Sequence, residues 1–192
     1  MIRWLTLLGV TLPALVLAVV GVSHPHELTP DTAQWWTDLH VLLIPVFPLL
    51  GVSHWILLHR ERGVIAWVAR VAAFLYMTFY GALDALAGIA TGTLMRQGAD
   101  SPGTRQMLFD IGNDLGRIGA WSFLVACVAT AIVAWLRAGR AALPGGLLLV
   151  ASSVSFLDSH IYWPRGVVTM LGLTVGFGLL ALTKATLTTS VD

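Results

Sequence analysis

Four of the six histidines in this chain lie on the predicted outer side of the membrane, together with several aspartates: His24, His26, His40 and His160. His24-x-His26 is a close pair, and Asp158-x-His160 offers two further donors. Imidazole and carboxylate groups are ligands for zinc, copper and iron. The residue types therefore predict a metal site, although none of the spacings is a motif for a particular metal. The candidate ligands are His24, His26, His40, Asp158 and His160.

Each histidine also has a purely structural explanation. His24 and His26 in a loop could simply be solvated. His160 is close to Tyr162 and Trp163 and could anchor a helix end at a membrane surface. The metal hypothesis therefore requires the fold to bring these separate segments to one point.

Asp84 is the clearest candidate for a reactive group. It interrupts an apolar run over residues 74–90, and Tyr76, Tyr80 and Asp84 share one helical face. An ionisable group at membrane depth costs at least ~2.5–3.5 kcal/mol, so it should face a partner or water. Asp84 and Tyr80 are thus the candidate catalytic residues, and the alternative is a carboxyl group that only fixes helix packing.

His40 and His54 are fourteen residues apart, about 21 Å along a helix. This spacing resembles that of the haem ligands in two-haem cytochrome b subunits. The resemblance covers one helix only, and His54 has no matching histidine on another helix. It implies at most one b-type haem, held by His40 and His160, as an alternative cofactor to a single metal ion.

Composition indicates a membrane protein. Hydrophobic residues make up 57% of the chain and charged residues 11%, and the mean hydropathy is +0.81. Soluble domains carry about 25% charged residues. A net charge of +1 gives no reason to expect a nucleic-acid partner. The single cysteine, Cys127, excludes an intrachain disulfide and a cysteine-based metal cluster.

Apolar runs predict an all-α integral membrane protein with six transmembrane helices in a single domain over residues 1–192. A helix needs about 20 apolar residues to cross a bilayer. The predicted spans are 4–22, 39–58, 71–92, 118–136, 141–157 and 166–183, with an interfacial helix over 105–114. The first run could instead be a signal peptide cut after Ser23, but its length favours a retained helix.

Loop charges predict the orientation. Seven basic residues fall on the side of the two termini and four on the other side, where they mix with acidic residues. The positive-inside rule then places both termini in the cytoplasm and the histidine-rich loops outside. We expect a multi-pass protein of the cell membrane, of the bacterial inner-membrane type.

Local patterns within the spans predict how the helices pack. Pro45 and Pro48 should loosen the second span. Small residues recur every three or four positions in the third span, which favours close helix packing; they are Gly81, Ala85, Gly88 and Gly92. Arg117, three residues beyond Asp114, should form an ion pair with it.

Three functions fit these observations. The leading hypothesis is an outer site for a zinc, copper or iron ion, or one haem, that performs redox, transfer or hydrolytic chemistry. The second is a solute or proton-coupled carrier that uses Asp84, Tyr80 and His54. The third is a non-catalytic subunit of a larger membrane complex or a homo-oligomer. Nucleotide-binding loops, serine-hydrolase elbows and zincin helices are not found in the sequence.

Overall fold

The computed structural model describes residues 2–189, and the chain is helical along nearly all of that length. In order, the elements are α1 (Ile2–Gly21), α2 (Ala33–Leu57), α3 (Val64–Leu83), the π-helix η1 (Asp84–Ala90), α4 (Thr91–Arg96), α5 (Pro102–Ala138), the 3₁₀ turn η2 (Gly139–Ala142), α6 (Leu143–Ser159) and α7 (Arg165–Thr189). The described residues contain no strand.

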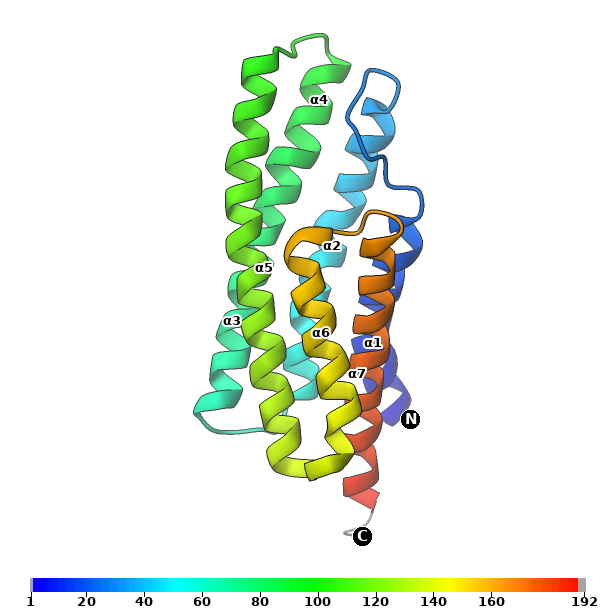
Figure 1. Cartoon of the computed structure of the whole chain (residues 1–192), viewed down its shortest axis with the longest axis vertical. Helices are drawn as coiled ribbons and strands as arrows, with labels where there is room; N and C mark the ends of the chain where they lie inside the picture. Colours follow the sequence, from blue (N-terminus) through cyan, green and yellow to red (C-terminus); the bar gives the residue numbers. More distant parts are fainter. Residues whose placement is uncertain (1, 190–192) are drawn as a thin grey trace.

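The helices form one elongated bundle and run alternately in opposite directions (Figure 1). The start of α1 and the end of α7 lie at the same end, which we call the terminal end. We call the opposite end the distal end. The loop between α6 and α7 lies about midway along the bundle, whereas α2, α4 and α5 continue to the distal end. The distal part therefore has fewer helices than the terminal part.

Five helical segments within residues 2–189 are long and apolar enough to cross a membrane. They are Trp4–Gly21, Ala33–Leu57, Val64–Arg96, Pro102–Ser159 and Arg165–Thr183. The fourth contains α5, η2 and α6, and α5 and α6 pack against each other as a hairpin. The prediction of an all-helical chain with helices of membrane-spanning length is confirmed.

Several helices extend beyond the predicted apolar spans. α5 is continuous from Pro102, so residues 105–114 are its first turns and not a separate helix. Ser101 caps α5, because its hydroxyl accepts a 3.2 Å hydrogen bond from the amide of Thr104, and proline suits the next position. Polar residues can continue a helix past the apolar stretch because their side chains lie in water.

α2 remains one helix through Pro45 and Pro48. Proline removes a backbone donor and leaves a carbonyl without its helical partner. Both prolines lie on the outer side of α2, where they are exposed or half-buried, while Leu43, Phe47 and Leu50 point into the core. The buried face of the helix is thus uninterrupted.

Aromatic side chains fill the centre of the bundle. Phe123 of α5 lies 4.7 Å from Tyr76 and 5.5 Å from Phe156, measured between ring centroids. Phe47 of α2 lies 4.8 Å from Tyr80, and Tyr80 lies 5.0 Å from Phe156. Rings packed at these separations stabilise one another beyond their burial of apolar area. The cluster ties α2, α3, α5 and α6 together.

Glycines allow α5 to lie close to α3 and η1. A side chain at Gly112, Gly116 or Gly119 would meet Ala87, Leu83 or Tyr80. Close approach of small residues is a common packing mode of membrane helices. This glycine stripe brings Tyr80 and the π-helix against α5.

The small residues predicted to form one packing face of the third span lie in two different environments. Gly88 and Gly92 do pack closely, but against His40 and Thr37 of α2. Gly81 has no neighbouring atom within 4 Å of the position of an added Cβ, and Ala85 is exposed. Sequence spacing alone does not show that the π-helix rotates the later glycines toward α2.

Candidate metal site

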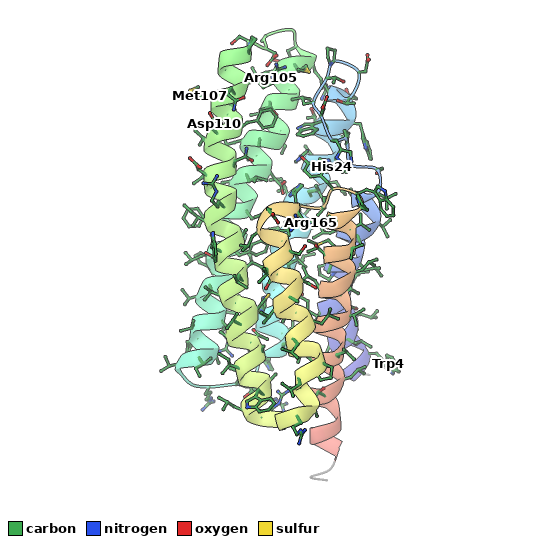
Figure 2. All side chains as sticks on the ribbon, in the orientation of Figure 1. Trp4, His24, Arg105, Met107, Asp110 and Arg165 are labelled. Atoms are coloured by element: carbon green, nitrogen blue, oxygen red, sulfur yellow. The ribbon has the colours of Figure 1, made fainter. Side chains whose placement is uncertain are left out.

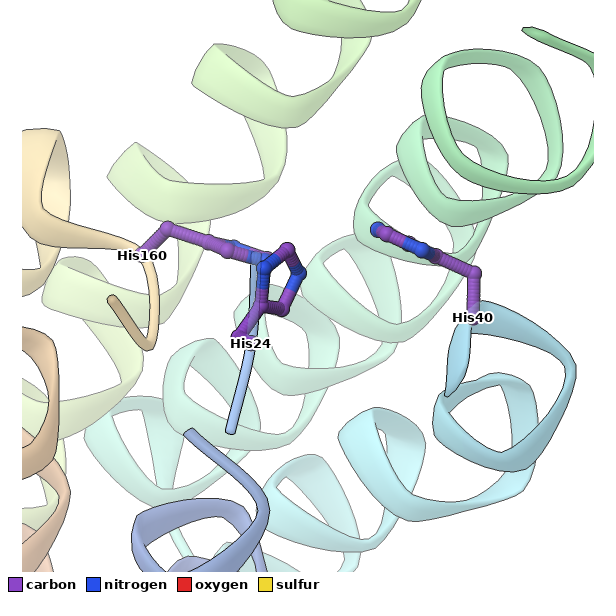
Figure 3. Close-up of side chains that lie close together, drawn as sticks. All are labelled: His24, His40 and His160. Atoms are coloured by element: carbon purple, nitrogen blue, oxygen red, sulfur yellow. The ribbon is translucent and has the colours of Figure 1, made fainter. Parts of the chain in front are cut away.

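Three histidines from separate parts of the chain meet at one point in the bundle (Figure 3). His24 lies in the loop after α1, His40 in the second turn of α2, and His160 directly after α6. One ring nitrogen from each can be chosen so that all three nitrogens lie within 4.8 Å of one another. We call this group the His cluster.

His24 is held by its neighbours on all sides. Its Nδ1 lies 2.7 Å from the carbonyl oxygen of Pro25, which can only accept, so Nδ1 carries the proton. Its ring lies edge-on to those of His40 and His160, with centroids 5.1 and 5.4 Å away. Its Nε2 is buried and has no hydrogen-bond partner among the described residues.

His40 is oriented by a tryptophan one turn earlier. Its Nδ1 lies 2.7 Å from the carbonyl oxygen of Trp36, so Nδ1 again carries the proton. The indole of Trp36 donates a 3.3 Å hydrogen bond to the carbonyl of Ala87 in η1. A π-helix shifts carbonyls out of the regular α-helical pattern, and such segments are frequent at functional sites. η1 thus fixes Trp36 and, through it, His40.

His160 ends α6 in an unusual backbone conformation. Its φ is 44°, a left-handed value that non-glycine residues seldom adopt and that recurs at functional sites. Its Nδ1 lies 2.7 Å from the hydroxyl of Tyr80. In all three histidines Nδ1 is therefore engaged with a neighbour, and Nε2 is the nitrogen left for a ligand.

Asp84 is the first residue of η1 and is fully buried. Both of its carboxylate oxygens lack a hydrogen-bond partner among the described residues. One turn before it, Tyr80 contacts His160, and one turn after it, Gly88 lies directly against the ring of His40. Asp84 is thus placed on the helix face beside the His cluster, although it is not one of the three grouped ligands.

The loop residues of the site have perturbed acid–base behaviour. Burial lowers the pKa of His24 to about 4 and lowers that of His160 well below its usual value, to which nearby His24 and His40 add. Burial, with a smaller contribution from the charge of Asp84, raises the pKa of Tyr162 to about 12. Both loop imidazoles are therefore neutral at pH 7, which is the form that binds metals.

A cavity of 690 Å³ lies against the His cluster. His40, His160 and Tyr80 form part of its wall, and the rest comes from the loop before α2, from η1, from α5 and from the end of α6. Its volume is in the range of small-molecule binding sites. Through this cavity a substrate would reach a metal ion held by the histidines.

The other predicted ligands lie near the His cluster but outside it. His26 is exposed and stacks on Tyr162, with ring centroids 5.4 Å apart. The carboxylate of Asp158 is exposed and accepts hydrogen bonds of 2.7 and 3.2 Å from the guanidinium of Arg165. Both residues line the cavity and lie outside the group formed by His24, His40 and His160.

His54 lies in a separate environment deeper in the bundle. Its Nδ1 is 2.8 Å from the hydroxyl of Thr130, and its Nε2 is 3.8 Å from Sγ of Cys127. The rings of Phe123 and Phe177 pack on it. The second ligand position of the cytochrome b spacing is thus occupied by a packed histidine that bonds across helices.

Three residues of the site were not predicted from the sequence as site residues. Trp36 orients His40, Tyr162 packs on His24 with centroids 4.5 Å apart, and Gly88 makes room for His40. Their types carry a weak signal, since tryptophan and tyrosine are common at membrane surfaces. Only their contacts distinguish them from surface anchors.

No protein-family model, curated protein or solved structure matches this chain. We therefore infer its function from the residues themselves.

Proposed function

We propose that this chain is a multi-pass membrane metalloprotein that binds one transition metal ion, zinc in the first instance, through His24, His40 and His160. The proposal extends to hydrolytic or group-transfer chemistry on a substrate held in the adjoining cavity. Three histidines with a fourth position left open is a ligand set of catalytic zinc sites.

The observation that carries the proposal is a set of buried polar atoms without partners. Nε2 of His24 and both oxygens of Asp84 are buried and unbonded within the described residues. An unpartnered buried polar group is costly, and a buried carboxylate more so. A divalent cation beside them accounts for both, because it binds the imidazole nitrogen and compensates the carboxylate charge.

The spacing of the three nitrogens is close to what a metal requires. Zinc–nitrogen bonds of about 2.05 Å in tetrahedral geometry place two nitrogens about 3.4 Å apart. The three nitrogens lie within 4.8 Å of one another.

The arrangement favours a single ion over haem. A bis-histidine haem needs open space for the porphyrin around the line between its two axial ligands. The ring of His24 occupies that space, between His40 and His160 (Figure 3). Binding of haem by His40 and His160 would require His24 to leave the site.

Residues around the ion have distinct proposed roles. A metal ion with an open position lowers the pKa of bound water toward 7. Asp84, buried beside the cluster, is the group that would accept a proton from a substrate or water. With Nε2 of His160 on the metal, Nδ1 would carry the proton and donate it to the hydroxyl oxygen of Tyr80, an outer contact that orients a ligand and increases its basicity.

We further propose six membrane crossings with both termini in the cytoplasm and the His cluster toward the outer surface. The helical hairpin of α5 and α6 would supply two of the crossings. In support, the start of α1 and the end of α7 lie at one end of the bundle (Figure 1). Seven basic residues lie toward that end: Arg3, Arg60, Arg62, Arg70, Arg137, Arg140 and Lys184.

The deciding experiment is metal analysis of protein purified in detergent, before and after loading with zinc. We expect one zinc per chain in the wild type. Each of the variants His24→Ala, His40→Ala and His160→Ala should lose most of it. His59→Ala is the matched control, because His59 is an exposed histidine at the other end of α2.

Two results would overturn the proposal. The first is wild-type protein that holds no more metal than the three cluster variants. The second is an equal loss in the His59 variant, which would indicate nonspecific binding. A Soret band in the purified protein would indicate that the site binds haem and not a single metal ion.

A further inference from the structure

The cavity beside the His cluster lies where the surface of the bundle changes from apolar to polar. On α5, Ile118 and Trp121 are about half exposed, whereas on the preceding turns exposed Asp110 and Asp114 alternate with the exposed apolar residues Met107 and Ile111. At the start of α7, Trp163 is 54% exposed and is followed by Pro164 and an exposed arginine. Such a change marks the edge of a bilayer, with tryptophans at the headgroups.

The His cluster lies at this same level. Figure 2 shows Arg105 and Asp110 of α5 nearer the distal end than His24, and Arg165 somewhat further toward the terminal end. The 37 residues of α5 span about 55 Å, well beyond a hydrocarbon core of about 30 Å. α5 is therefore longer than the hydrocarbon core is thick, and the distal turns of α2, α4 and α5 extend past the loop between α6 and α7 (Figure 1).

The cavity wall on α5 combines polar and apolar side chains. Arg105, Phe109, Asn113 and Arg117 line it from the distal side. Gly116 and Ala120 continue the wall toward the terminal end, together with apolar side chains of α3, η1 and α6: Leu83, Ala87, Phe156 and Leu157. A ligand that fills this cavity must combine a polar group with an apolar portion.

A second groove continues from the cavity along the outside of α5. It is lined by Asp114, Arg117, Ile118, Trp121, Ser122 and Val125 and has a volume of 540 Å³. Arg117 lines both spaces. Beyond Arg117 the groove is mostly apolar and lies on the surface that faces lipid, so an acyl chain suits it.

Arg117 is the cation best placed to bind an anionic group. Its ion pair with Asp114 is long, 3.7 Å, and both side chains are mostly exposed, so the pair is weak. By contrast, Arg105 is held at 2.9 Å by Asp100, and Asp158 is neutralised by Arg165. A guanidinium recognises phosphate through two parallel hydrogen bonds.

From these observations we propose that the cavity binds a membrane glycerophospholipid. Its phosphate would lie at Arg117, its headgroup in the cavity beside the His cluster, and an acyl chain in the groove along α5. The lipid proposal rests on the proposed metal site only for the reaction that would follow lipid binding. Binding itself depends on Arg117 and the shape of the cavity.

Native mass spectrometry of the delipidated, zinc-loaded protein in detergent tests this proposal. The added ligands are phosphatidylglycerol, phosphatidylethanolamine, diacylglycerol and glycerol phosphate. We expect retention of both phospholipids, with at least tenfold weaker retention of diacylglycerol, which lacks phosphate, and of glycerol phosphate, which lacks acyl chains.

The variants make the test specific. Arg117→Gln should reduce phospholipid retention about tenfold, the loss of one charge-assisted contact of about 1.4 kcal/mol. Asn113→Trp should reduce it by narrowing the cavity. Both positions are exposed, so the fold should tolerate the changes. Arg60→Gln, at an exposed arginine beyond α2, is the control and should retain lipid like the wild type.

The outcomes separate this proposal from the metal site. Equal retention by the Arg117 and Arg60 variants, or equal retention of diacylglycerol and phospholipid, would overturn the lipid site. Zinc content is measured on the same samples. Arg117-dependent lipid retention without zinc would sustain the lipid site and overturn the metal site, and zinc without specific lipid retention would do the reverse.

Discussion

The hydroxyl of Tyr80 lies 2.7 Å from Nδ1 of His160, although the two residues are eighty positions apart. Tyr80 is 4% exposed, and its ring stacks over that of His160 at an interplanar angle of 22°. The contact joins α3 to the end of α6 and leaves Nε2 of His160 directed to other partners. It is the point at which the aromatic core of the bundle meets the His cluster.

Tyr80→Phe should therefore weaken metal binding without unfolding the protein. Loss of an outer contact to a metal ligand typically costs 10–100-fold in affinity. Zinc affinity is measured by competition with a chelator. Tyr76→Phe is the control, because the buried Tyr76 hydroxyl has no hydrogen-bond partner among the residues that the structure describes, and its removal should leave zinc affinity unchanged. Equal losses in both variants would contradict the role of Tyr80.

Gly88→Ala should abolish high-affinity metal binding. A Cβ at this position would collide with the ring of His40, so the ring must leave its place or α2 must move. Overpacking of this kind costs about 1–3 kcal/mol of stability. Gly81→Ala on the preceding helix is the matched control, since within the described part of the chain no atom beyond its own helix turn lies within 4 Å of the added methyl group. Thermal unfolding and zinc content of both variants provide the comparison.

The metal-free protein should lose stability as the pH falls from about 6.5 toward 4. Burial lowers the pKa of His24 to about 4, below its ordinary value of 6.5. Between these values the unfolded chain binds a proton that the folded chain does not, so acid favours unfolding. Protonation linked to His24 should lower the free energy of unfolding by on the order of 3 kcal/mol.

The measurement is the unfolding midpoint in detergent between pH 7 and pH 4. His24→Gln cannot titrate and should show a flatter pH dependence, with a remainder from His160, whose pKa is also lowered. His59→Gln should behave like the wild type, because His59 is exposed. A pH profile unchanged by His24→Gln would show that His24 is not buried as a neutral imidazole.

His26→Ala and Asp158→Asn should leave zinc affinity within about twofold of the wild type. His26 stacks on Tyr162, and Asp158 pairs with Arg165, so neither group is needed around the metal. Exposed ion pairs contribute little stability, so both variants should also fold normally. A large drop in zinc affinity in either variant would enlarge the ligand set beyond the three histidines.

His54→Leu separates the metal site from the carrier hypothesis. His54 bonds to Thr130 inside the bundle, so its removal should cost about 1–3 kcal/mol of stability and leave zinc binding intact. A carrier that uses Asp84 and His54 would instead lose transport in both the His54→Leu and Asp84→Asn variants. Proton flux into liposomes, measured beside zinc content, distinguishes the two.

Much of the local structure was predictable from the sequence. The apolar runs predict helices because each is too long and too apolar for another structure in lipid, and the structure has helices over all six. The ion pair between Asp114 and Arg117 follows from their three-residue spacing on α5. These features depend on neighbours along the chain.

The π-helix and the rotation of the helices were not predictable in the same way. Gly88 faces His40 because η1 changes the helical period after Asp84, and nothing in the periodicity of the apolar residues indicates this. Likewise, His26 and His24 are two residues apart in one loop, yet His24 is 3% exposed and His26 is exposed. Their spacing in the sequence gives His24 and His26 the same status as candidate ligands and does not predict this difference in burial.

The sequence by itself determined a helical chain with helices of membrane-spanning length, and it supplied histidines and an aspartate within an apolar run, which are residue types found among metal ligands. The tertiary structure decided that His24, His40 and His160 form the group and that Asp158, His26 and His54 do not. The reason is physical: convergence of side chains 16 and 120 residues apart depends on helix rotation and helix contacts. Local patterns in the chain do not specify either.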